Sequence, residues 1–115
     1  MECLFCKIVN KELPSEIVYE DKEILVFKDI NPKAPVHLLI VPKKHIPSVN
    51  ELKKEDKDLI GSLFLVAKNM AEKIGIKKTG YRLCFNVGKG AGQVVDHLHL
   101  HLLGGWTDAV PKHNI

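Results

Sequence analysis

The chain has 115 residues, of which 45% are hydrophobic and 27% charged, and this composition is that of an ordinary globular protein. Its length fits a single domain over residues 1–115 that can bury a core. The net charge of +3, from 17 basic and 14 acidic side chains, is too small to indicate nucleic-acid binding.

Other features of the composition bear on the compartment. The apolar runs are too short to span a membrane, and the N-terminal residues, which include Glu2, lack the core of a secretion signal. Three cysteines, an odd number, argue against a disulfide framework. We therefore expect a cytoplasmic protein without a membrane or nucleic-acid partner.

The first half of the chain predicts a short helix and three strands. Residues 3–9 are expected to form the helix, and residues 17–20 and 24–28 a hairpin around a polar turn. Residues 36–41 are a continuous apolar run apart from His37, bracketed by Pro35 and Pro42. Such a run is typical of a buried central strand.

The second half predicts one long helix and two further strands. The helix, over residues 54–74, is indicated by apolar residues at helical spacing, with Gly75 at its end: Leu59, Leu63, Val66, Met70 and Ile74. The strands are expected at residues 82–87 and 98–103. This order predicts an α+β domain with a five-stranded, mainly antiparallel sheet, covered on one face by the long helix and open on the other.

Three of the six histidines, His97, His99 and His101, alternate with leucine. On a strand this spacing places the three imidazoles about 6.6 Å apart on one face and the leucines on the other. Because imidazole can act as nucleophile, acid, base or metal ligand, we expect the chemistry here. From spacing alone, a metal bound by the alternating histidines is an alternative.

A glycine-rich loop, residues 86–95, precedes the histidines. Its three glycines allow backbone N–H groups to approach an anion, so beside the histidines it indicates a phosphate site more than a flexible hairpin. Asn86 is placed to donate its amide to a phosphoryl oxygen.

Two cysteines, Cys3 and Cys6, form a CxxC pair. The pair alone is weak evidence, because the redox interpretation needs a βαβ context that is not predicted here. His45 and one histidine of the triad would complete a tetrahedral zinc site. The third cysteine, Cys84, is predicted to be a small core residue.

The segment from His97 to Leu103 resembles the His-x-His-x-His-x-x motif, with x hydrophobic, of the histidine-triad superfamily. Other segments resemble the Hint branch of that superfamily, the purine nucleoside phosphoramidases. They lie in the same order over nearly the whole chain, at residues 3–9, 20–21, 27–37, 41–46, 80–82 and 92–93.

The resemblance implies a homodimer whose two sheets join into one of ten strands. It also implies hydrolysis of nucleoside 5′-phosphoramidates, with a preference for purines. His99 would be the nucleophile and would form a covalent nucleotidyl-histidine, which water converts to nucleoside monophosphate. A hydrogen bond from the His99 ring to a backbone carbonyl would expose the attacking lone pair.

Further roles follow from the resemblance. His101, Asn86 and the backbone after Gln93, including Val95, would bind phosphate. Asp29, which taken alone is a turn residue, would bind the ribose. His37, taken alone a core histidine, would hydrogen-bond to the first histidine of the triad, His97. The apolar base pocket would be formed by Phe5, Ile8, Leu13, Phe27 and Ile30.

The resemblance also implies a structural zinc ion bound by Cys3, Cys6, His45 and His97. Four protein ligands leave no open position, so the ion would not be required for catalysis. The chain departs from the family at Val94, where a serine is common whose hydroxyl helps to protonate the leaving amine. Valine has no proton to donate.

Two alternatives stay open. The first is a dinucleoside polyphosphate hydrolase of the fragile-histidine-triad type, although the CxxC pair and residues 43–46 favour the Hint branch. The second is a nucleotide- or zinc-binding regulatory module with vestigial activity, for which Val94 is the best support. A nucleotidyltransferase is disfavoured, because that branch has glutamine where this chain has His101.

Overall fold

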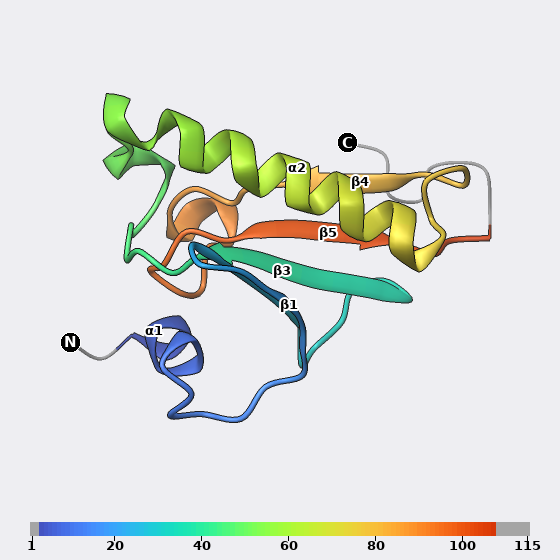
Figure 1. Ribbon diagram of the computed structural model, residues 1–115, viewed down its shortest axis with the longest axis horizontal. Helices are drawn as coiled ribbons and strands as arrows, with labels where there is room; N and C mark the ends of the chain where they lie inside the picture. The colour runs from blue at the N-terminus through green and yellow to red at the C-terminus, as the bar shows by residue number, and fades with distance from the viewer. Residues whose placement is uncertain (1–2, 108–115) are drawn as a thin grey trace.

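The computed structural model describes residues 3–107, which form a five-stranded sheet between one long and one short helix (Figure 1). The elements are α1 (Leu4–Val9), β1 (Ile17–Glu20), β2 (Ile24–Lys28), β3 (Val36–Pro42), α2 (Lys57–Ile74), β4 (Tyr81–Cys84) and β5 (Leu100–Gly104). Single 3-10 turns lie at Val49–Glu51, Lys54–Asp56 and Lys89–Ala91. Within this part of the chain, no helix is long and apolar enough to cross a membrane.

The strands lie in the order β1-β2-β3-β5-β4, and every neighbouring pair is antiparallel. The turn between β1 and β2 is closed by Asp21, whose carboxylate accepts the backbone N–H groups of Glu23 and Ile24 at 2.8 Å. The predicted α+β class, with its five-stranded antiparallel sheet and two helices, is confirmed.

The two faces of the sheet carry separate cores. The long helix α2 lies on one side of the sheet and the short helix α1 on the other (Figure 1). On one face α2 packs against alternate strand residues, among them Leu38, Ile40, Leu100 and Leu102. On the other face α1 packs through Phe5 and Ile8 against Leu25, Phe27, Leu39 and Val41. The expectation that this second face is open is therefore wrong, because α1 covers part of it.

Several predicted boundaries need correction. The long helix begins at Lys57, since residues 54–56 form a 3-10 turn held by Asp56, whose carboxylate accepts the N–H of Lys53 at 2.9 Å. The strand predicted from residue 98 begins at Leu100, because the N–H of Leu98 donates to the Ile46 carbonyl at 2.7 Å. His97 and His99 therefore precede the strand.

The strand predicted at residues 82–87 is β4, which ends at Cys84. Its last pair joins Cys84 to His101, and its partner β5 begins one residue earlier, so no ladder extends β4 to residue 87. Cys84 is only partly buried, which corrects the prediction that it belongs to the core.

Candidate functional site

A cavity of about 430 Å³ opens on the α1 side of the sheet. Asp29, Val95, His99 and His101 line it, and so do the five apolar residues expected around the base, Phe5, Ile8, Leu13, Phe27 and Ile30. Neither Asn86 nor Gln93 is among its lining residues. The fold thus places a largely apolar slot beside two imidazoles and one carboxylate.

Gln93 is buried and holds the glycine-rich loop in shape. Its side-chain oxygen accepts the N–H of Gly88 at 2.9 Å, and its amide donates to the carbonyls of Pro47 and Val95 at 2.7 and 3.0 Å. The side chain is therefore engaged in closing the loop. Sequence reasoning considered only the backbone here and missed this role.

His99 has a defined tautomer. Its Nδ1 lies 2.7 Å from the backbone carbonyl of His97, which only accepts, so Nδ1 carries the proton and Nε2 keeps a lone pair. The ring of Phe5 packs edge-on against it, with centroids 5.0 Å apart. Burial lowers the pKa of His99, and the His97 carbonyl and the Asp29 charge offset this only in part. The ring is therefore neutral at neutral pH.

His37 and His101 form a hydrogen-bonded pair. The backbone N–H of Lys33 donates to His37 Nδ1 at 3.0 Å, so the His37 proton is on Nε2. That Nε2 lies 2.9 Å from His101 Nδ1 and 3.4 Å from a carboxylate oxygen of Asp29. Since His101 Nδ1 accepts, the proton of His101 is on its Nε2.

The Nε2 of His101 is buried and has no hydrogen-bond partner in the part of the chain that the structure describes. Leaving a buried donor unpaired costs about 1–3 kcal/mol, so the arrangement fits a group that a ligand oxygen completes. Burial, with the neighbouring His99 and His37 rings, lowers the pKa of His101 to about 4. His101 is thus a neutral hydrogen-bond donor.

The partner of His37 differs from the prediction. His37 contacts His101, the third histidine of the triad, and not the first. The register explains the difference, because β3 pairs His37 with Leu103 and Leu39 with His101. His37 therefore lies near the C-terminal end of the motif, whereas His97 precedes the first residue of β5.

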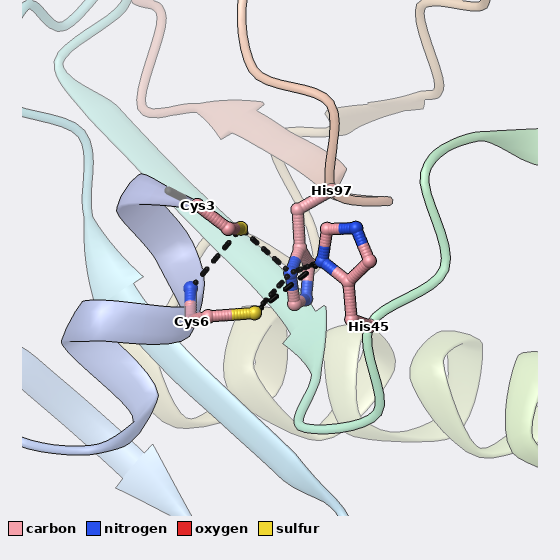
Figure 2. Close-up of side chains that lie close together, drawn as sticks. All are labelled: Cys3, Cys6, His45 and His97. Atoms are coloured by element: carbon pink, nitrogen blue, oxygen red, sulfur yellow. Dashed lines mark hydrogen bonds between the residues drawn. The ribbon is translucent and has the colours of Figure 1, made fainter. Parts of the chain in front are cut away.

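His97 belongs to a different cluster, with Cys3, Cys6 and His45 (Figure 2). The Nδ1 of His97 lies 3.4 and 3.5 Å from the two sulfurs and 3.2 Å from the Nδ1 of His45. The Cys6 sulfur lies 3.3 Å from the same His45 atom. The four donor atoms all lie within 4.8 Å of one another.

These distances can be compared with a tetrahedral site. Zinc bonds of about 2.3 Å to sulfur and 2.0–2.1 Å to nitrogen require separations of about 3.6 Å between sulfur and nitrogen and about 3.4 Å between nitrogens. The four separations given above agree with these values within a few tenths of an ångström. The Nε2 of His97 lies 2.8 Å from the Pro42 carbonyl, so Nε2 is protonated and Nδ1 turns its lone pair to the sulfurs.

Comparisons with known proteins identify the family of this chain. A family model described as "Scavenger mRNA decapping enzyme C-term binding" matches residues 2–110. A solved HIT family hydrolase from Legionella pneumophila Philadelphia 1 is 52% identical, with a TM-score of 0.90 over 91% of this chain and 94% of that chain. A HIT family hydrolase from Clostridium thermocellum is 50% identical, with a TM-score of 0.92 over 97% and 96%. The chain belongs to the histidine-triad (HIT) family.

A curated relative is similar in sequence and has a named activity. The purine nucleoside phosphoramidase of Escherichia coli (strain K12) is 46% identical over 104 residues, which cover 90% of this chain and 87% of the relative. Each of these relatives spans nearly the same length as this chain.

Proposed function

We propose that this chain is an enzyme that hydrolyses the P–N bond of nucleoside 5′-phosphoramidates. The observation that carries the proposal is the hydrogen bond from His99 Nδ1 to the His97 carbonyl, which leaves a nucleophilic Nε2 on a neutral ring at the cavity. The curated relative, a purine nucleoside phosphoramidase, supports the reaction and a preference for purines.

In the first step, His99 Nε2 attacks the α-phosphorus, and the bond from phosphorus to the amine nitrogen breaks. The His97 carbonyl stabilises the positive charge that develops on the His99 ring. The protonated Nε2 of His101 donates to a phosphoryl oxygen, where negative charge builds up in the transition state. The leaving nitrogen takes its proton from solvent, because Val94 has none to offer.

In the second step, water attacks the phosphorus of the nucleotidyl-histidine and the bond from phosphorus to His99 breaks. One proton of the attacking water passes to solvent and replaces the proton taken up by the amine. The net reaction consumes one water and yields a nucleoside monophosphate and a free amine.

The rest of the pocket orients the nucleotide. The Asp29 carboxylate accepts the N–H of Asn31 at 2.8 Å, lies at the cavity, and is proposed to bind the ribose hydroxyls. The apolar slot is proposed to receive the base. We also retain Asn86 and the backbone from Gln93 to Val95 as proposed phosphate contacts, although among these only Val94 and Val95 line the cavity.

We also propose that Cys3, Cys6, His45 and His97 hold a structural zinc ion, as the spacing of their donor atoms supports. Such an ion would stabilise the N-terminal segment against the sheet and would supply no chemistry to the reaction. Its ligands must be reduced thiols, which supports the cytoplasm as the compartment. Protein purified without added zinc is expected to contain about one ion per chain, and Cys6→Ala protein is expected to contain none.

A homodimer of single-domain protomers is proposed as the assembly. β4 lies at one edge of the sheet, where a second copy could extend it to ten strands. Phe64 and Leu65 of α2 are 41% and 62% exposed, and the Phe64 ring packs on Phe85, just beyond the end of β4. Sedimentation equilibrium tests the assembly, and a mass of 12.9 kDa would contradict it.

One assay separates the proposed activity from its alternatives. Purified protein is incubated with adenosine 5′-phosphoramidate and, in parallel, with diadenosine tetraphosphate, and adenosine monophosphate (AMP) is measured by chromatography. Faster release from the phosphoramidate supports the proposal. Faster cleavage of the dinucleotide would identify the polyphosphate hydrolase, and binding of AMP without turnover of either compound would identify the regulatory module.

Introducing a hydroxyl at residue 94 should increase the rate of the reaction. Val94 is 88% exposed and lines the cavity, so a serine there can reach the leaving group without disturbing the core. We expect Val94→Ser to raise kcat by about 10-fold for poorly activated amines, since a positioned proton donor contributes at least this much. Val94→Ala is the matched control, and an equal gain in both variants would show that the hydroxyl is not responsible.

A further inference from the structure

We propose that the metal cluster and the nucleotide pocket are coupled, so that an ion bound by Cys3, Cys6, His45 and His97 raises the affinity of the pocket for nucleotide. By linkage, a bound nucleotide must then raise the affinity of the cluster for the ion by the same factor. The inference rests on the proposed function, because it requires a nucleotide in the cavity.

The first connection between the two sites is one residue. The His97 ring contributes Nδ1 to the cluster and is held at Nε2 by the Pro42 carbonyl, 2.8 Å away. The backbone carbonyl of the same residue holds His99 Nδ1 at 2.7 Å. The position of the His97 ring therefore bears directly on the orientation of His99.

The second connection is the six-residue helix α1, which contributes residues to both sites. Cys3 caps the helix, because its sulfur accepts the N–H of Cys6 at 3.3 Å, and Cys6 lies within the helix. Between them, Phe5 places its ring edge-on to both His97 and His99, at centroid distances of 6.0 and 5.0 Å. Phe5 also lines the nucleotide cavity, as Ile8 does from the next turn.

The sign of the coupling follows from the length of this helix. A helix of six residues has no stability of its own, so its place depends on packing and on anything that ties it to the sheet. An ion would tie Cys3, which caps the helix, and Cys6, which lies within it, to two histidines outside α1. Those histidines are His45 and His97. The part of the pocket that α1 forms would then be ordered before the nucleotide binds. The loss of conformational entropy on binding would therefore be smaller.

The first test measures nucleotide affinity with and without metal. Isothermal titration with AMP is carried out on zinc-loaded protein and on protein freed of metal by a chelator under reducing conditions. We expect the metal-free protein to bind AMP about 10-fold more weakly, within the usual range for coupled sites. Cys6→Ser should bind as the metal-free protein does. Cys84 lies outside both the cluster and the cavity lining. Cys84→Ser should therefore show the same difference in AMP affinity between zinc-loaded and metal-free protein as the wild type does.

The second test reads the metal site directly, with Co(II) in place of zinc. In a chelator competition, saturating AMP should tighten Co(II) binding by the factor found in the first test, and it should shift the visible absorption bands of the bound Co(II). If circular dichroism shows that metal-free protein loses its fold, the proposal is judged by the Co(II) absorption bands alone. Bands that do not shift when AMP is added would then overturn the proposal.

The outcomes separate this inference from the function on which it rests. Equal AMP affinities in folded metal-free and zinc-loaded protein would overturn the coupling and leave the proposed function standing. Failure of both forms to bind AMP would contradict the proposed function itself.

Discussion

Replacing His99 by alanine should lower the turnover of adenosine 5′-phosphoramidate by about 10,000-fold or more, because loss of a covalent nucleophile removes the main reaction path. Among residues 3–107, no other imidazole is placed to substitute for it. His101 has its proton on Nε2 and its Nδ1 occupied by His37, and His97 turns both of its ring nitrogens away from the cavity, to Pro42 and to the cysteines. AMP release measured by chromatography gives the rate.

A pocket variant that leaves the nucleophile in place provides the control. Leu13 lines the same cavity, so Leu13→Ala should raise KM while kcat stays within about 10-fold of wild type. Rapid acid or base quenching of wild-type protein with labelled substrate should trap nucleotide on the protein, and His99→Ala should trap none. Comparable kcat values for His99→Ala and Leu13→Ala would eliminate His99 as the nucleophile.

The pH dependence of the wild-type enzyme tests the same residue. Burial lowers the pKa of His99 below the ordinary 6.5, so the ring keeps its lone pair as the pH falls through that value. The nucleophile is lost only when the pH falls through the lowered pKa of the folded protein. We therefore expect the acid limb of kcat/KM to lie below pH 6.5, and a limb at or above 6.5 would contradict the assigned environment.

Replacing His37 by leucine should lower kcat/KM by about 100-fold, although His37 donates to His101 and its proton does not face the substrate. Without that donor, the proton of His101 can shift to Nδ1, and the Nε2–H that points to the phosphoryl group is lost. Residues that hold a catalytic imidazole in one tautomer have effects of this order or larger. Steady-state kinetics on the folded variant measures the loss.

Two further measurements distinguish positioning by His37 from a merely structural role. His37→Gln retains an N–H donor that can reach His101 Nδ1, so it should recover part of the lost activity. Removing the His37 ring also removes one of the influences that lower the pKa of His101, so the pKa of His101, followed by nuclear magnetic resonance, should rise in His37→Leu. Equal losses of activity in the leucine and glutamine variants, with an unchanged pKa of His101, would argue for simple unfolding of the pocket.

Local patterns were sufficient to predict most of the fold. The hairpin strands and the long helix are encoded by spacing and by Gly75, whose φ of +90° ends the helix, so each could be predicted without knowledge of distant contacts. The boundaries near the site were predicted less well. Leu98 donates to Ile46, about fifty residues earlier, and no local pattern indicates such a contact.

The contacts of the histidines also required the folded chain. His37 was expected beside the first triad histidine, but strand register placed it beside the third. The hydrogen bond from the Lys33 N–H to His37 could not be predicted from the sequence, because every residue except proline has a backbone N–H. The same holds for the Pro42 carbonyl beside His97.

The sequence by itself determined which chemical groups the protein has, the alternation of histidine with leucine, and membership of a family, because these are properties of residue type and spacing. Only the tertiary structure decided which group holds the proton of each triad ring in place: the Pro42 carbonyl at His97, the His97 carbonyl at His99, and His37 at His101. The physical reason is that the tautomer of an imidazole depends on the donor or acceptor beside it. Those neighbours are brought together from distant parts of the chain by strand pairing and by the packing of α1.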